Sequence, residues 1–434
     1  MASSQKLGKW GTTALVLGNM IGSGIFLLPA SLALYGGISL LGWLMSSLGA
    51  LVMALIFSRL SKRMPQSGGP YVFSRFGFGD FAGFLVAWGY WISICTTNAA
   101  ITVAFLGYLS VFFPILGGNV LLSVITGLGC VWTLTWINTR GVQTAGYVQV
   151  ITTILKITPL ILVAIVGLFY IDMDHFKIFN LSDRSTIQAI TETATLTLFA
   201  YLGIESATIP ADNISNARQT IPKATYLGTA LAILIYVLGS FSVMGVIPAE
   251  ALRHSEAPFA DAAAIIWGDK ARYMVAFGAL IATFGALNGW ILIQGQIPMA
   301  AAKDQLFPSL FKQKNGRGSP VWGILISSII ISILIVLNYS RGLIGAFEFM
   351  ILLSTLFVLV PYLFSSATYI LIALGTDQKW HWVWGVLAFG FSIWAVVGSG
   401  KEVVFWGFVV LMMGLPLYVF VTLKNRTSSQ DKKR

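Results

Sequence analysis

Charged residues are scarce in this 434-residue sequence, where Asp, Glu, Lys and Arg together make up 10% of the chain. An ordinary soluble domain carries about 25% charged residues. The shortage excludes a soluble enzyme and a disordered chain. Hydrophobic residues make up 56% of the sequence and form continuous runs, unlike the alternating pattern of an outer-membrane β-barrel. The composition therefore predicts an all-α integral membrane protein.

Residues that often carry chemistry are also rare. The two cysteines, Cys95 and Cys130, lie in apolar runs, so we expect neither a disulfide framework nor a metal site. The three histidines, His175, His254 and His381, fall in or beside predicted loops. Without a nucleophile–base pair at membrane depth we expect no enzyme and no cofactor. The net charge of +11 comes without a basic patch interleaved with aromatics, so nucleic acid is not an expected partner.

Long apolar runs dominate the rest of the sequence. A helix that crosses a bilayer needs about 20 apolar residues. About twelve runs qualify, at 11–34, 40–60, 81–106, 119–137, 145–171, 187–209, 224–246, 272–299, 320–338, 345–374, 381–398 and 402–423. Short polar or Gly/Pro segments separate these spans, so we expect no inserted soluble domain.

The distribution of positive charge predicts an orientation. If the N-terminus is cytoplasmic, most of the 27 Lys and Arg residues fall in segments on the cytoplasmic side. The positive-inside rule then places both termini in the cytoplasm. We therefore expect a multi-pass protein of the bacterial inner membrane, on the condition that the number of spans is even.

Two predicted spans contain helix-breaking residues at mid-membrane depth. Residues 18–25 of span 1 read Gly-Asn-Met-Ile-Gly-Ser-Gly-Ile, and residues 201–206 of span 6 read Tyr-Leu-Gly-Ile-Glu-Ser. Close helix–helix packing also recruits small residues. The five-span spacing and the polar residue in each run favour two broken helices instead. Their free amides suit a carboxylate and their free carbonyls suit an ammonium, which together make a site for a zwitterion.

Two ionisable residues lie within predicted spans. Lys156 stands about 11 residues into span 5, roughly 17 Å along the helix, which is too deep for its side chain to reach water. It must face carbonyls, hydroxyls or a carboxylate, either as a proton carrier or as a fixed cation that holds helices together. A cation here disfavours sodium coupling. Glu205, in the span 6 break, is a second proton-site or gate candidate, or a carboxylate that pairs with a basic side chain or caps the amides of the broken helix.

Other polar and aromatic residues lie at similar depth. Span 3 holds Tyr90 and Asn98, and a buried Asn needs hydrogen-bond partners. Phe199 precedes the span 6 break, while Trp290 and Ser354 lie in the middle of spans 8 and 10. An aromatic face beside a polar pocket can hold a cationic head group. Most of the aromatic residues are expected only to pack.

Seven segments match a known family. They are Gly22-Ser23-Gly24-Ile25-Phe26-Leu27-Leu28-Pro29, Ser67-Gly68-Gly69-Pro70-Tyr71, Gly203-Ile204-Glu205-Ser206-Ala207, Gly289-Trp290 with Gln296, Leu306-Phe307-Pro308, Val360-Pro361-Tyr362 and Trp394-Ala395-Val396-Val397-Gly398-Ser399-Gly400. On these segments the chain resembles the amino acid–polyamine–organocation superfamily, and most of all the bacterial arginine/agmatine antiporters and their basic amino acid/polyamine relatives. The resemblance runs nearly end to end.

The resemblance implies a fold and an assembly. It implies a leucine-transporter-like fold in which residues 1–171 and 172–374 are inverted five-helix repeats. Residues 375–434 would form helices 11 and 12 and a basic cytoplasmic tail. Helices 11 and 12 serve dimer contacts in the antiporters, so the resemblance implies a homodimer, with membrane lipid and a small amino acid or polyamine as the other partners.

The resemblance also implies roles for individual residues. It places the substrate carboxylate at Ser23 and Gly24. It places the amino group at carbonyls of Met20, Phe199 and Leu202. The residues that match the guanidinium site are Ser93, Ile94, Asn98 and Ser354. Trp290 matches a gate position and is also expected to contact the substrate. The other residues that match gate or proton-sensing positions are Tyr90, Glu205 and, for pH sensing, Tyr71.

Two departures from the antiporter pattern bear on substrate and coupling. The arginine antiporters carry Trp where this chain has Phe199, and Phe offers a weaker cation–π face, which weakens the case for arginine. They also lack a lysine in span 5. Lys156 instead resembles the lysine of proton-coupled amino acid permeases, where it stands in for the sodium of sodium-coupled relatives.

The sequence therefore favours a secondary transporter that exchanges a basic, arginine-like amino acid for its amine or another amino acid. The alternative is proton-coupled uptake through Lys156, with neutral amino acids among the possible substrates. Replacing Lys156 by Ala would separate the two, because it should abolish proton-driven uptake and largely spare exchange. A transporter-like sensor is disfavoured, since its usual mark is a long cytoplasmic extension.

Overall fold

The computed structural model describes residues 6–140, 145–316, 318–338, 341–375 and 380–431. Its α-helices are α1 (Lys9–Met20), α2 (Gly24–Ala33), α3 (Ser39–Arg63), α4 (Pro70–Ser110), α5 (Ile115–Gly118), α6 (Val120–Thr139), α7 (Ala145–Val166), α8 (Thr186–Leu198), α9 (Ala217–Val246), α10 (Ala249–Leu252), α11 (Pro258–Trp267), α12 (Asp269–Gln294), α13 (Gln296–Lys303), α14 (Val321–Asn338), α15 (Gly342–Leu374), α16 (Trp382–Gly398), α17 (Lys401–Met412) and α18 (Gly414–Asp431). Short 3₁₀ turns are η1 (Gly36–Ile38), η2 (Gly167–Tyr170), η3 (Met173–Phe176), η4 (Phe199–Tyr201), η5 (Ser206–Thr208), η6 (Ala211–Asn213) and η7 (Ser309–Lys312). Within these ranges the only extended pairing is an isolated bridge between Leu7 and Ile214, so the all-α prediction is confirmed.

The predicted spans coincide with helices. In the described residues, nine helical stretches are long and apolar enough to cross a membrane. The shorter apolar stretches Lys156–Tyr170, Val321–Leu337 and Trp382–Gly398 coincide with predicted spans 5, 9 and 11. A further short helix, α11, was not predicted; its 10 residues cover about 15 Å, too little for a bilayer core of about 30 Å.

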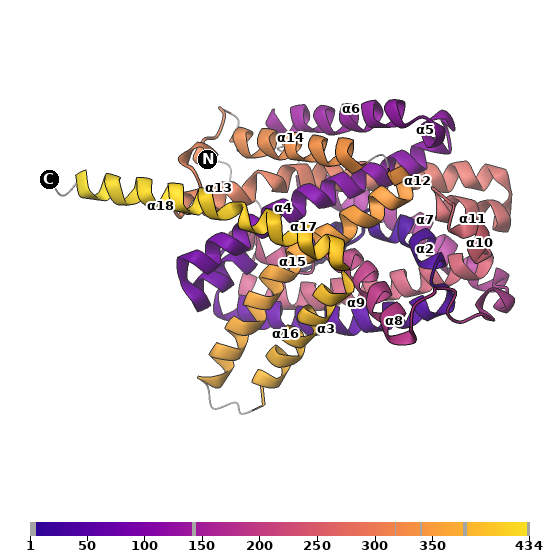
Figure 1. Cartoon of the computed structure of the whole chain (residues 1–434), viewed down its shortest axis with the longest axis horizontal. Coiled ribbons are helices and arrows are strands. Elements are labelled where there is room, and N and C mark those ends of the chain that lie inside the picture. Colours follow the sequence, from indigo (N-terminus) through magenta and orange to yellow (C-terminus); the bar gives the residue numbers. More distant parts are fainter. Residues whose placement is uncertain (1–5, 141–144, 317, 339–340, 376–379, 432–434) are drawn as a thin grey trace.

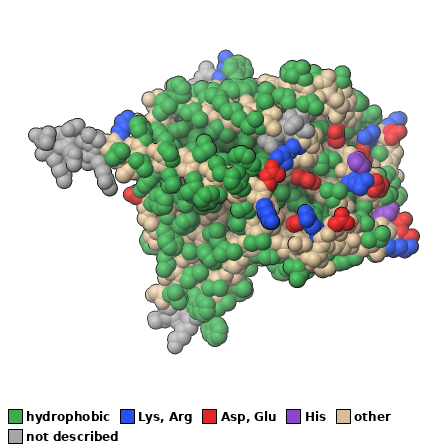
Figure 2. Space-filling model, in the orientation of Figure 1, with side chains coloured by type: hydrophobic (Ala, Val, Ile, Leu, Met, Phe, Trp, Pro, Cys, Tyr) green, Lys and Arg blue, Asp and Glu red, His purple; other side chains and the backbone are tan. Residues whose placement is uncertain are grey.

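Burial separates central helices from peripheral ones. Of the most apolar window in each span, 89% is buried in Lys9–Ala33 and in Pro70–Ser110, against 28% in Val120–Thr139 and 17% in Lys401–Asn425. Spans 1 and 3 therefore form the centre, and α6, α17 and α18 form the outside (Figure 1). The face seen in Figure 2 is largely hydrophobic, and its charged side chains gather mainly toward the right-hand half. This is the surface expected where lipid contacts the protein.

Packing between helices repeats in pairs. Span 1 packs against span 7 through α1 and α9. Its counterpart five spans later, span 6, packs against span 2 through α8 and α3. In the same way α7 on α9 matches α15 on α3, and α4 on α15 matches α12 on α7. Three further contacts join a span to its own counterpart five spans later: α3 with α9, α4 with α12 and α6 with α14. Two structurally equivalent halves would produce this pattern.

Both ends of the described chain lie at the same end of the bundle. Four hydrogen bonds connect the segments there: Ser215 N to Leu7 O (2.9 Å), Gly68 N to Ile209 O (3.1 Å), Tyr71 hydroxyl to Asp304 (2.7 Å) and Asn425 Nδ2 to Gln305 O (2.8 Å). These bonds join the two ends of the described chain to the loops between α3 and α4, between α8 and α9, and after α13.

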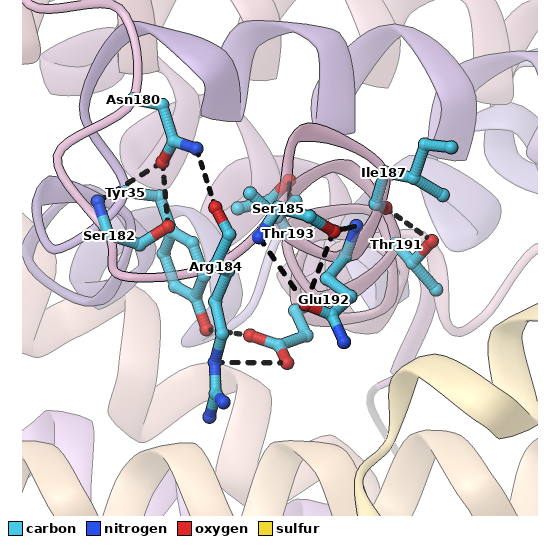
Figure 3. Close-up of polar contacts among 11 residues, drawn as sticks. Tyr35, Asn180, Ser182, Arg184, Ser185, Ile187, Thr191, Glu192 and Thr193 are labelled. Carbon is cyan, nitrogen blue, oxygen red and sulfur yellow. Dashed lines mark hydrogen bonds and ion pairs between the residues drawn. The ribbon is translucent and has the colours of Figure 1, made fainter.

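A polar network lies at the other end of span 1, where α8 begins (Figure 3). The Tyr35 hydroxyl donates to Glu192 Oε2 at 3.0 Å, and Arg184 Nε lies 3.5 Å from Glu192 Oε1. Burial, with Glu192 adding to it, raises the pKa of Tyr35, so its hydroxyl stays protonated and donates. A capping box formed by Ser185 and Gln188 satisfies the first turn of α8. This network fixes the start of the helix that later breaks at mid-membrane.

Candidate functional site

A cavity lies where the two predicted helix breaks meet. Its volume is about 10 Å³, the space of about one water molecule. The residues that line it are Asn19, Met20, Gly22, Ser23, Gly24, Thr97, Ile101, Phe199, Leu202 and Trp290. They come from spans 1, 3, 6 and 8. None of these lining residues is charged, so backbone dipoles, hydroxyls, the Asn19 amide and aromatic faces supply the polarity.

The break in span 1 presents a helix start to this cavity. Helix α1 ends at Met20, Ile21 leaves the helical region at ψ 84°, and α2 begins at Gly24. The N-cap residue, Ser23, makes no side-chain cap hydrogen bond, and its buried Oγ has no partner among the described residues. First-turn amides of a helix lack partners within the helix and carry partial positive charge. This end of α2 is therefore suited to bind an anion such as a carboxylate.

The break in span 6 is confirmed and goes further than predicted. Helix α8 ends at Leu198; Leu202 is extended and Gly203 has φ 109°. Beyond this point the chain forms only the 3₁₀ turns η5 and η6, so the second half of the predicted span is not an α-helix. A left-handed φ of this kind favours glycine. A Cβ on Gly203 would also lie 3.3 Å from Met20 N, so the two breaks pack backbone against backbone.

Carbonyl oxygens at the breaks remain available to a donor. Met20 O accepts the Gly22 amide at 2.8 Å, and Phe199 O accepts the Leu202 amide at 3.1 Å. A carbonyl oxygen has two lone pairs, so each can accept a second hydrogen bond. An ammonium group offers three donors. The cavity thus combines a helix start for an anion with carbonyls for a cation, as a zwitterion requires.

The Lys156 side chain contacts the backbone at the break in span 1. Its buried Nζ donates to Gly18 O at 2.8 Å and approaches Ile21 O at 3.4 Å. The prediction that it faces the protein interior and finds carbonyls is confirmed. A cation at the C-terminal end of α1 interacts favourably with the helix dipole. The side chain therefore fixes the end of α1, next to the lining residues Asn19, Met20 and Gly22.

Glu205 connects span 6 to two other helices. Its carboxylate accepts hydrogen bonds from the Tyr90 hydroxyl of α4 at 2.7 Å and the Tyr362 hydroxyl of α15 at 2.9 Å. All three side chains are buried. Two tyrosine hydroxyls therefore take the place of the basic side chain that the sequence left open as a partner. Tyr71 lies elsewhere, at the start of α4, where it donates to Asp304 beside Arg75.

Comparison with known proteins identifies the chain. The family model described as amino acid permease matches residues 7–428, nearly the whole sequence. The chain belongs to the amino acid permease family. It is accordingly a multi-pass membrane protein, in agreement with its apolar helices.

Three curated relatives align with at least 92% of the permease. It is 30% identical over 444 residues to the cadaverine/lysine antiporter of Escherichia coli (strain K12), with 99% of this chain and 98% of that protein aligned. It is 31% identical over 422 residues to the arginine/ornithine antiporter of Pseudomonas aeruginosa, covering 92% and 87%. It is 29% identical over 432 residues to a putrescine transporter of Haemophilus influenzae, covering 98% of both.

The permease brings six of the ten predicted substrate residues to the cavity wall. They are Met20, Ser23, Gly24, Phe199, Leu202 and Trp290. The other four, Ser93, Ile94, Asn98 and Ser354, are buried but do not line it. The Ser354 hydroxyl lies 2.6 Å from Thr97 Oγ1 and 3.2 Å from Ser93 Oγ, forming a hydroxyl cluster behind the wall. Thr97 is the one member of this cluster that lines the cavity.

Four lining residues were not predicted as contacts: Asn19, Gly22, Thr97 and Ile101. Asn19 and Gly22 belong to the Gly/Asn run that marks the span 1 break, so their position was predictable and their contact was not singled out. Asn19 Nδ2 is buried with no partner among the described residues. Thr97 and Ile101 lie on the same face of α4, since residues four apart share a helix face, so one contact with the cavity predicts the other.

Proposed function

We propose that this permease exchanges a basic α-amino acid for its amine or for another amino acid. The observation that carries the proposal is its end-to-end similarity to three proteins named for transport of cationic amino acids or amines. The chemistry of the cavity supports it. The uncapped start of α2 suits a carboxylate, and the carbonyls at Met20 and Phe199 suit an amino group.

In this proposal the substrate carboxylate binds at Ser23 and Gly24, and its amino group binds carbonyls of Met20, Phe199 and Leu202. The faces of Phe199 and Trp290 hold the cationic side chain through cation–π contact. The backbone carbonyls of Ser93 and Ile94 in span 3, the Asn98 amide and the Ser354 hydroxyl of span 10 form the distal end of the site. Tyr90, Glu205 and Trp290 act as gates, and Tyr71 responds to pH.

A second candidate function is proton-coupled uptake of an amino acid. The observation in its favour is Lys156, a buried lysine bonded to backbone carbonyls beside the cavity. A lysine in this place can release its proton when its surroundings change. The exchange proposal treats it as a fixed cation instead.

The proposal extends to membrane and assembly. We place the permease in the bacterial inner membrane with both termini in the cytoplasm, following the positive-inside rule. Residues 1–171 and 172–374 act as the two inverted repeats. The apolar helices α16, α17 and α18 are proposed to contact a second copy, because much of their apolar surface is exposed.

A binding competition tests the substrate class. The purified protein is incubated with labelled arginine, and unlabelled arginine, ornithine, lysine, cadaverine and norleucine compete. Norleucine has nearly the shape of lysine without its charge. We expect the cationic compounds to compete at concentrations at least about tenfold lower than norleucine, the factor that roughly 1.4 kcal/mol of cation–π and hydrogen-bond energy provides. Equal competition by norleucine would refute a site for basic substrates.

A further inference from the structure

A buried amide pair lies directly beside the cavity. Asn98 of α4 donates from Nδ2 to Gln294 Oε1 of α12 at 2.8 Å, and both side chains are 0% exposed. Gln294 lies one helical turn after Trp290, and Asn98 lies between Thr97 and Ile101. Those three neighbours all line the cavity. Neither member of the pair does.

The partners of Gln294 fix which way its amide points. Its Nε2 lies 3.1 Å from Ile324 O and 3.0 Å from Ser328 Oγ. A backbone carbonyl can only accept a hydrogen bond, so the atom facing Ile324 must be the amino nitrogen. The oxygen of Gln294 therefore faces Asn98. The Ser328 hydroxyl is held in turn by Thr135 at 2.6 Å, which ties the network to α6.

The orientation of Gln294 dictates that of Asn98. Because Gln294 presents an oxygen, Asn98 must donate from its NH₂ group, and the Asn98 oxygen points away from the pair. That oxygen, Oδ1, is buried and has no hydrogen-bond partner in the described part of the chain. An unsatisfied buried acceptor costs free energy, so a donor from a ligand would be favourable there.

We propose that Gln294 is a positioning residue that holds the Asn98 amide with its oxygen free, so that this oxygen can accept a hydrogen bond from the cationic head of a substrate bound in the neighbouring cavity. This role rests on the proposed function. A guanidinium or ammonium group carries only donors and matches a free oxygen. The reverse orientation would present an NH₂ group, which repels such a head and suits a carbonyl or ureido oxygen.

The pair of arginine and citrulline tests this role, since the two have similar shapes and citrulline replaces one guanidinium nitrogen by an acceptor oxygen. Binding of each is measured to the full-length protein in detergent, for wild type and for Gln294→Leu. Without Gln294 the Asn98 amide can turn over. We expect the arginine-to-citrulline affinity ratio to fall by about tenfold, the effect of about one charge-assisted hydrogen bond.

Two further variants separate positioning from general loosening of the helices. Thr135→Val removes the Thr135–Ser328 bond from the same network but leaves Gln294 and Asn98 paired, so the wild-type ratio should persist. The double variant Gln294→Leu/Asn98→Asp should regain preference for arginine, because both carboxylate oxygens of an Asp accept whichever way it turns. If Gln294→Leu fails to give monodisperse protein, the unbranched Gln294→Met serves the same comparison.

Each result bears on a different claim. A wild-type preference for arginine that Gln294→Leu leaves intact would overturn the role of Gln294 and leave the proposed function standing. An equal loss in Thr135→Val would also overturn it, since the effect would then follow from network disruption. A wild-type protein that binds citrulline as well as arginine would refute the proposed function itself, and this role with it.

Discussion

Gly24→Val is expected to weaken substrate binding by about 100-fold, the effect of losing roughly 1.5–3 kcal/mol of charge-assisted hydrogen bonding to the substrate. A Cβ on Gly24 would lie 3.1 Å from Ala200 Cα and 3.2 Å from Phe199 Cδ1. Two further methyl carbons must then push α2 away from the span 6 break. The uncapped amides of α2 and the carbonyl of Phe199 would no longer face the same substrate. Equilibrium binding of labelled substrate measures the loss.

A matched control uses another mid-membrane glycine. Gly89 lies in α4, and a Cβ there would meet no atom closer than 3.5 Å, which is ordinary contact. Gly89→Ala should therefore bind substrate as the wild type does, while Gly24→Ala should fall between wild type and Gly24→Val. Normal affinity in a well-folded Gly24→Val protein would show that the two breaks do not form the binding site together.

Lys156→Met is expected to lower the unfolding temperature in detergent by about 5 °C, because a hydrogen bond from a charged group contributes roughly 1.5–3 kcal/mol. Methionine has a similar length and no charge, so Gly18 O and Ile21 O lose their donor with little change in packing. Exchange should continue at a reduced rate, since the cavity residues remain. Any uptake that a proton gradient drives into empty vesicles should disappear.

The readouts for Lys156→Met distinguish a fixed cation from a proton carrier. Thermal unfolding reports the structural contribution, and exchange at several pH values reports proton handling. A fixed cation predicts that the pH dependence of exchange keeps its shape in the variant. Unchanged thermal stability together with loss of a proton-driven activity would instead identify Lys156 as the proton site.

The sequence was sufficient to predict the helix breaks and much of the cavity wall. Gly22, Ser23 and Gly24 have low helix propensity and lie where an apolar span should be continuous. The local sequence is therefore enough to predict the break in span 1. The same holds for Gly203, whose φ of 109° favours glycine. Local signals of this kind do not depend on knowing the partner helix.

Contacts between distant helices were not predictable in the same way. Asn98 was expected at the substrate, yet its amide donates to Gln294, which lies 196 positions away. Choosing between a ligand and a protein partner requires the position of α12 relative to α4, which no local pattern contains. For the same reason Thr97, the neighbour of Asn98, takes the place on the cavity wall. The close approach of Gly203 to Asn19 and Met20 is likewise a contact between distant segments that no local pattern contains.

Labelled arginine uptake into proteoliposomes tests the central claim of exchange most directly. One set of vesicles is preloaded with arginine or agmatine, and the other is empty with an inward proton gradient. An exchanger takes up label only when a counter-substrate is inside, so we expect uptake in the preloaded set alone. Uptake into empty vesicles that follows the proton gradient would contradict exchange and identify a proton-coupled permease.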